Sequence, residues 1–171
     1  VILMLQDIRL KDSDTHQFLG DLFEGFLTKG VKQSEGQFFT PMPIVRFIVT
    51  SLPLEQLIKD SQDVPYAIDY ACGAGHFLTE YADRIKEFVK QYRPDLSLHD
   101  YYSRIMGIEK EYRLSKVSKV SAFMYGHDET QIVYSDALKS HPNVEEGKYS
   151  VLIANPPYSV SGFLETLSEQ D

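Results

Sequence analysis

The chain has 171 residues, of which 43% are hydrophobic and 25% are charged, a composition typical of one globular domain with its own core. No apolar run approaches the roughly 18 residues of a membrane span, the single cysteine excludes an intrachain disulfide, and five scattered histidines lack metal-ligand spacing. The formal charge of −8 predicts poor DNA binding by this chain alone, and the composition as a whole favours a cytoplasmic protein with no metal site.

The N-terminal stretch predicts a short apolar start followed by an amphipathic helix. The opening VILML lacks the basic region and cleavage site of a signal peptide, so we expect a cut-off core element of a longer protein. Asp14 or Thr15 can cap a helix that ends near Gly30. Its apolar positions repeat at helical spacing: Phe18, Leu19, Leu22, Phe23, Phe26 and Leu27. Such a stripe is typical of a core helix, so we expect a structural role.

The next segment, GQFFTPMPIVRFIV, predicts a loop followed by a second helix. Thr40 can cap this helix and Pro41 fits its first turn. Free backbone amides at such a helix start favour an anion, for example a ligand carboxylate. Phe38 and Phe39 in the loop are open to two interpretations, as core residues or as ligand contacts.

Tyr66 to Ala71 predicts the first sheet strand, followed by a glycine turn and a helix from Phe77 to Tyr92. Gly73 and Gly75 allow the backbone to approach a ligand closely. Their spacing differs from the dinucleotide fingerprint, since Leu78 stands where a third glycine is required, and this argues against NAD. Asp69 at the strand end can accept from an ammonium group, or it can simply cap the turn.

Two further strands are predicted, each followed by an acid. Arg104 to Glu109 is the second strand, and Thr130 to Tyr134 is the third, with Asp136 just beyond it. The helix between them, Tyr112 to Tyr125, is expected to bury Leu114, Val117, Val120 and Met124. Glu109 suits ribose hydroxyls, although alone it is as readily a solvated charge. Acids at three strand ends are a much stronger signal than any one of them.

The stretch VLIANPPY predicts a fourth strand, buried on both faces and stopped at Asn155 because the prolines after it cannot donate to a ladder. Asn155 brings an amide to the carboxyl edge of the sheet, Pro156 a carbonyl and Tyr158 an aromatic face, and Pro157 restrains the backbone between them. This set suits a planar base with an exocyclic amine. The plain alternative is a strand followed by a proline turn.

In chain order, GQFFTP, DYACGAGHFL, GIEK, SDA and NPPY resemble the DNA methyltransferases that methylate N6 of adenine, most closely the modification subunits of type I restriction-modification systems. The resemblance covers Gly36 to Tyr158. NPPY is shared with enzymes that methylate glutamine or guanine amines, whereas GQFFTP ahead of the glycine turn is specific to the DNA-modifying branch. Tyr70 replaces the usual proline after the aspartate, and Ala74 replaces a frequent serine.

The resemblance implies an α/β, Rossmann-like S-adenosylmethionine-dependent methyltransferase fold, with a truncated, mainly parallel sheet of order 3-2-1-4, right-handed crossovers and helices on both faces. It places the cofactor over Gly73 and Gly75. By the same resemblance, the other cofactor contacts are divided among five residues: Phe39, Thr40 and Asp69 at the methionine end, Glu109 on the ribose and Asp136 on the adenine amine.

The resemblance also implies catalytic residues and partners. A target adenine flipped out of DNA is expected to stack on Tyr158, while Asn155 and Pro156 accept from its amine. The implied partners are a specificity subunit and a restriction subunit in the cytoplasm of a bacterium or archaeon. Two alternatives stay open: a protein-glutamine or RNA-amine methyltransferase, and a non-catalytic cofactor-binding or assembly module.

We divide the chain into two parts. Residues 1–60 are predicted to be an N-terminal helical segment with the GQFFTP loop and the helices that follow, and residues 61–171 the N-terminal part of the catalytic domain. The fourth strand would then be an exposed edge. We therefore expect a fragment that self-associates and does not methylate DNA alone.

Overall fold

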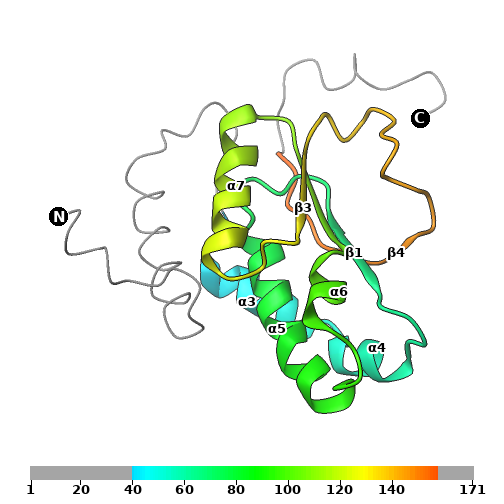
Figure 1. Cartoon of the computed structure of the whole chain (residues 1–171). Helices are drawn as coiled ribbons and strands as arrows, with labels where there is room; N and C mark the ends of the chain where they lie inside the picture. Colours follow the sequence, from blue (N-terminus) through cyan, green and yellow to red (C-terminus); the bar gives the residue numbers. More distant parts are fainter. Residues whose placement is uncertain (1–39, 158–171) are drawn as a thin grey trace, which may run out of the picture.

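The computed structural model describes residues 40–157, which form a parallel sheet with helices packed against it (Figure 1). The helices are α3 (Met42–Ser51), α4 (Leu54–Asp60), α5 (His76–Tyr92), α6 (Leu98–Tyr102) and α7 (Tyr112–Met124). The strands are β1 (Tyr66–Asp69), β2 (Ile105–Glu109), β3 (Gln131–Tyr134) and β4 (Tyr149–Leu152). The predicted helix after Asp14 and the site residues Phe39 and Tyr158 lie outside the described residues.

The strand order of the sheet is β3-β2-β1-β4 and each pair is parallel, which confirms the expected order 3-2-1-4. The register sets Asp69 of β1 beside Gly107 of β2, and Glu109 of β2 beside Tyr134 of β3. Strand β1 ends at Asp69, two residues before the predicted end at Ala71. The chain turns there because Asp69 Oδ1 accepts a hydrogen bond of 3.0 Å from the Ala71 backbone amide.

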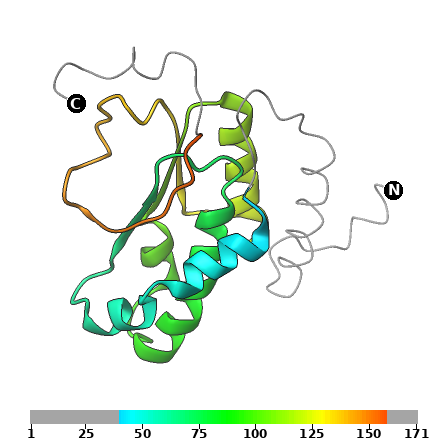
Figure 2. The same ribbon diagram turned by 180° about the vertical axis from the view of Figure 1, so that it is seen from behind.

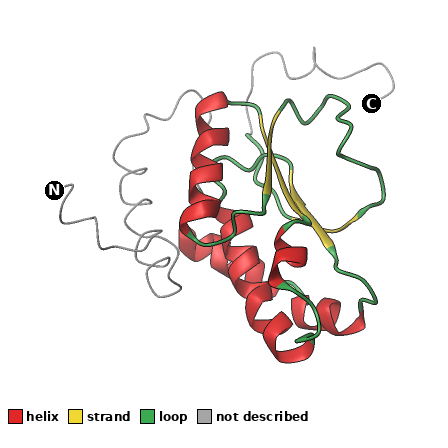
Figure 3. Ribbon diagram, in the orientation of Figure 1, coloured by secondary structure: helices red, strands yellow, loops and turns green. Residues whose placement is uncertain are grey.

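The described helices gather on one face of the sheet, where they are drawn in red in Figure 3. Helix α5 lies at the centre of this layer and contacts β1, β2 and each of the other described helices; Figure 2 shows α3 beside it. The apolar stripe of α5 is buried as predicted: Phe77, Leu78, Tyr81, Ala82, Ile85 and Val89. Val45 of α3, Leu54 of α4 and Val151 of β4 join the same core. The division of the chain at residue 60 stays a prediction.

The opposite face of the sheet carries a smaller core. Ile68, Met106 and Ile108 are buried there. Val133 of β3, Tyr149 of β4, and Ala137 and Val144 of the β3–β4 connection pack against them. We expected helices on both faces, but within residues 40–157 this face is covered by a loop. The connection is polar and contains Pro142 and Gly147, which disfavour a helix.

Strand β4 differs from the prediction in its burial and its end. Val151 and Ile153 are buried, whereas Leu152 between them is 62% exposed, so the expectation of burial on both faces is wrong. The reason is that β4 pairs only with β1 among the described strands and has no described helix over the face that bears Leu152. The strand ends at Leu152 rather than at Asn155, although the Ile153 backbone amide still donates to the Ile68 carbonyl at 3.0 Å.

The loop expected between Asp95 and Ser103 contains a short helix, α6. Ser97 caps it by accepting a hydrogen bond of 3.2 Å from the His99 backbone amide. Tyr101 and Tyr102 of α6 are buried against the core. The sequence did not reveal this helix because a segment of five residues is too short to show helical periodicity. No helix within residues 40–157 has both the length and the hydrophobicity of a membrane span.

Helix α7 buries a face of small residues rather than the predicted one. Of the four residues expected inside, Leu114 is buried, while Val120 is 45% exposed. The buried positions are otherwise small: Ser115, Ser118, Ser121 and Ala122. Small side chains let α7 approach the glycine turn, where a Cβ added to Gly75 would lie 2.5 Å from Ser118 Oγ. The close packing of α7 on the glycine turn, rather than the apolar pattern of its sequence, therefore decides which face of α7 is buried.

We expect Gly75→Ala to lower the free energy of unfolding by about 2–4 kcal/mol, because it adds a clash with Ser118 to the cost of a left-handed backbone. Gly75 has a φ of 88° and begins α5. Chemical denaturation measures the loss. Gly147→Ala is the matched control, since Gly147 has a φ of 71° and no atom within 4 Å of an added Cβ. Equal losses in the two variants would contradict the close approach.

Candidate functional site

The carboxyl ends of β1, β2 and β3 bring the three predicted acids to one edge of the sheet. Asp69 is the last residue of β1 and Glu109 the last residue of β2. Asp136 lies two residues after β3, and the ladder continues towards it because the Ser135 amide donates to the Glu109 carbonyl at 3.1 Å. The sequence prediction of an acid at each strand end is consistent with this geometry.

Glu109 is held beside the glycine turn by two backbone donors. Its Oε2 accepts from the Gly73 amide at 2.9 Å, and its Oε1 accepts from the Glu111 amide at 2.7 Å. The side chain is 9% exposed, so both bonds form in a partly dry environment. Each carboxylate oxygen keeps a second lone pair that can accept from a hydroxyl group. Glu109 is therefore an oriented acceptor rather than the solvated charge that the sequence left open.

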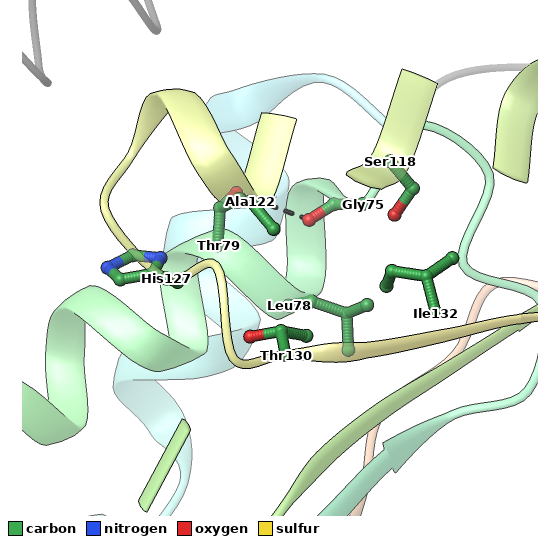
Figure 4. Close-up of a pocket in the computed structure, with 8 residues that line it drawn as sticks. All are labelled: Gly75, Leu78, Thr79, Ser118, Ala122, His127, Thr130 and Ile132. Carbon is green, nitrogen blue, oxygen red and sulfur yellow. Dashed lines mark hydrogen bonds between the residues drawn. The ribbon is translucent and has the colours of Figure 1, made fainter. Parts of the chain in front are cut away.

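The two glycines of the turn have different roles. Gly73 has a φ of 54°, and an added Cβ would meet no atom within 4 Å, so its backbone is open to an approaching ligand. Gly75 instead faces Ser118 across the narrow crevice drawn in Figure 4, which is too small to hold a water molecule. Gly73 thus leaves room for a ligand, whereas Gly75 lets α5 pack closely against α7; the cofactor contacts of both glycines stay predictions.

Asp69 is a buried acid with one unsatisfied oxygen. The residue is 1% exposed; Oδ1 accepts from the Ala71 amide, whereas the buried Oδ2 has no hydrogen-bond partner among the described residues. Burial raises the pKa of Asp69 to about 7, Ala71 opposes this rise, and the nearby Glu109 charge adds to it. A buried acceptor without a partner is costly. A cationic donor such as an ammonium group would satisfy it and restore its charge, so Asp69 fits the predicted group while also capping the turn.

Asp136 is paired with a lysine that the sequence interpretation did not use. Lys110 Nζ lies 2.7 Å from Asp136 Oδ2, and the Leu138 amide donates to Oδ1 at 3.2 Å. The hydrogen bond from Lys110 is the main reason why the pKa of Asp136 lies below its usual value. The neighbouring lysine in GIEK was the signal that could have revealed this pair. Asp136 is thus an ionised acceptor at the end of β3.

On the β4 side of the edge, Thr40 and Asn155 meet across 115 positions of sequence. Asn155 Nδ2 donates to Thr40 Oγ1 at 2.9 Å. The prediction that Thr40 caps α3 is wrong. Pro41 holds the N-cap position without a side-chain hydrogen bond, and Pro43 rather than Pro41 lies in the first turn. Since the amino group of Asn155 donates to Thr40, the acceptor atom of the same amide is Oδ1. The threonine of GQFFTP and the asparagine of NPPY therefore lie side by side at this edge.

The NPPY segment follows directly from the last bond between β4 and β1. Ile153 is held by the Ile68 carbonyl, one residue before Asp69, so Asn155 emerges beside the end of β1. Asn155 is partly buried, while Pro156 and Pro157 are exposed. Within residues 40–157, no group of three or more His, Cys, Asp or Glu side chains is arranged to hold a metal ion. The edge offers acceptors and backbone amides for an organic ligand.

Comparison with known proteins agrees with this chemistry. Residues 14–171 match the N-6 DNA Methylase family. The chain is 29% identical over 157 residues to the type I restriction enzyme MjaVII methylase subunit of Methanocaldococcus jannaschii, covering 90% of this chain and 24% of that protein. It is 27% identical over 151 residues to the type II methyltransferase M.VspI of a Vibrio species, covering 87% of this chain and 32% of that protein. The chain thus spans about a quarter to a third of these relatives.

Two solved structures share the fold. One, from Listeria monocytogenes, is of a protein proposed to be a class I S-adenosylmethionine-dependent methyltransferase, with a TM-score of 0.68 and 21% identity over 96% of this chain and 47% of that one. The other is the modification subunit of a proposed type I restriction enzyme from Vibrio vulnificus, with a TM-score of 0.67 and 22% identity over 98% of this chain and 34% of that one. This chain has the fold of the class I methyltransferases, and it belongs to the N-6 DNA methylase family.

Proposed function

We propose that this chain is the cofactor-binding part of an enzyme that transfers a methyl group from S-adenosylmethionine to N6 of adenine in DNA, as the modification subunit of a type I restriction-modification system. Family membership and the curated methylase relatives support DNA as the substrate over a protein glutamine or an RNA amine. The observation that carries the proposal is that Asp69, Glu109 and Asp136 share one sheet edge with the Thr40–Asn155 pair.

The cofactor's groups match the acceptors along this edge in order. Its ammonium group would satisfy the unpartnered Oδ2 of Asp69, and its ribose hydroxyls would reach Glu109. Its adenine amine would donate to Asp136. Its carboxylate would lie near Thr40 and Phe39 at the start of α3, where helical amides favour an anion. Because S-adenosylmethionine carries a net positive charge, a row of three acids is complementary to it.

For the methyl transfer itself, we assign the NPPY segment. Adenine N6 is a poor nucleophile because its lone pair is delocalised into the ring. Asn155 Oδ1 and the Pro156 carbonyl would accept its two hydrogens and localise that lone pair, while Pro157 holds the backbone and Tyr158 stacks on the flipped base. S-adenosylmethionine would supply the methyl group, its sulfur keeping the bonding pair, and N6 would then lose a proton to water.

Thr40 would position Asn155 for this step. An amide can rotate by half a turn and exchange its oxygen and nitrogen positions, and only one of these orientations presents an acceptor to the base. The hydroxyl of Thr40 accepts from Nδ2 at 2.9 Å, so the amide stands with its nitrogen towards Thr40. The GQFFTP loop would thereby serve the target base as well as the cofactor.

The partners follow from the charge and from the relatives. A chain of net charge −8 gains little from phosphate contacts, so DNA affinity would come from a specificity subunit, with a restriction subunit completing the system. We place the enzyme in the cytoplasm of a bacterium or archaeon. Among the described strands, β4 pairs only with β1, and its Leu152 is exposed. Both features support self-association of this chain when it is isolated.

The cofactor assignment predicts that Glu109→Ala and Asp136→Ala each weaken S-adenosylmethionine binding by about 10- to 100-fold, the value of a hydrogen bond to a charged group. Titration calorimetry measures the affinities, and circular dichroism checks the folds. Glu87→Ala removes an exposed acid of α5 and is the matched control. Unchanged affinity in both site variants would refute the assignment.

For the complete enzyme, Asn155→Ala is expected to leave cofactor affinity nearly intact and to lower turnover about 10²–10³-fold, by analogy with loss of an oxyanion donor. Thr40→Val should lower turnover by about 2- to 10-fold through loss of one hydrogen bond. Methyl incorporation into DNA under single-turnover conditions gives both values. Thr50→Val, which removes an exposed hydroxyl of α3, is the control. Full turnover by Asn155→Ala would disprove the role of the amide.

We also expect the 171-residue chain alone to lack DNA methylation activity, since it spans only 24–32% of its curated relatives. A methylation assay with light scattering on the purified chain tests this. Sequence-specific adenine methylation by a clean monomer would show the expectation to be wrong.

A further inference from the structure

The pair formed by Lys110 and Asp136 crosses the part of the edge where the cofactor adenine would bind. Lys110 directly follows the last residue of β2, and Asp136 lies just beyond β3, the next strand of the sheet. Their side chains meet at 2.7 Å, between Lys110 Nζ and Asp136 Oδ2. The pair therefore links the ends of two neighbouring strands.

Both oxygens of Asp136 are engaged in the protein as it stands. Oδ1 accepts from the Leu138 backbone amide and Oδ2 from Lys110. The backbone donor is fixed by the turn after β3, whereas Lys110 is a flexible side chain that is 67% exposed. An incoming amine that needs Asp136 would displace the lysine more easily than the backbone amide, because the lysine can return to water.

We propose that Lys110 is a latch: it engages the acid that binds the cofactor's adenine amine and competes with that amine for Asp136 Oδ2, so that the pair lowers the affinity of the site for the cofactor. This inference rests on the proposed function. It makes Lys110 a residue that tunes binding without contacting the reacting atoms. It also gives the acidic edge a countercharge at Asp136 before cofactor arrives.

The physical strength of the latch is modest. Exposed ion pairs contribute little, so the competition would change cofactor affinity by about two- to fivefold. Salt screens such pairs, hence the difference should shrink as ionic strength rises. A modest latch suits an enzyme that must release its product, because the demethylated cofactor keeps the adenine amine and meets the same competitor.

The test compares Lys110→Met with the parent in the full-length protein. We expect Lys110→Met to bind S-adenosylmethionine about two- to fivefold more tightly, and to bind S-adenosylhomocysteine more tightly by the same factor, because both carry the adenine amine. Lys139→Met is the matched control: this exposed lysine acts on Asp136 only through its charge. Titration calorimetry at two ionic strengths provides all of these affinities.

A second pair of variants separates competition at Asp136 from general charge effects. In an Asp136→Asn background the lysine loses its carboxylate partner, so adding Lys110→Met should no longer change cofactor affinity. Three results would overturn the latch: no tightening by Lys110→Met, equal tightening by Lys139→Met, or tightening for S-adenosylmethionine only. Failure of the parent protein to bind either molecule would instead refute the proposed function, and the latch with it.

Discussion

The parallel pairing of β1 with both β2 and β4 is the constraint on which the rest of the structure depends. Parallel strands end at the same edge, so residues that follow them in sequence meet there however far apart they are in the chain. Asp69 and Glu109 come together through the β1–β2 pair, and Asn155 reaches the same edge through the β1–β4 pair. The helices on one face hold this sheet by a single shared core.

The edge concentrates acidic groups in a partly buried place, and the protein offsets this cost in three ways. Backbone amides donate to both oxygens of Glu109, a lysine neutralises Asp136, and burial raises the pKa of Asp69 to about 7 so that it can hold a proton. The lysine on Asp136 and the proton on Asp69 can be exchanged for contacts with a ligand, whereas the backbone amides keep Glu109 in place. The ligand-free arrangement is therefore suited to binding a cation.

The sequence predicted most of this site because its residues sit next to strong local signals. Glycines, strand ends and prolines fix where the chain turns, so the positions of Asp69, Glu109 and Asn155 could be read directly. It failed where a local signal was weak or misleading. Thr40 looked like a helix cap but bonds to Asn155, and the sequence did not show that Gly75 packs closely on Ser118. The roles of Phe39 and Tyr158 stay predictions, because both residues lie outside the described part of the chain.

The sequence by itself determined the acids at the strand ends, through local pattern, and the family, through its ordered motifs; the strand order followed from the resemblance to that family. Only the tertiary structure decided how side chains distant in sequence share the edge. The Thr40–Asn155 bond, the Lys110–Asp136 pair and the exposure of Leu152 depend on which elements become neighbours. The spacing of apolar residues shows which face of a helix or strand points inward, but not which element packs against that face. Hydrogen bonds between side chains at the sheet edge are fixed only when the strands assemble.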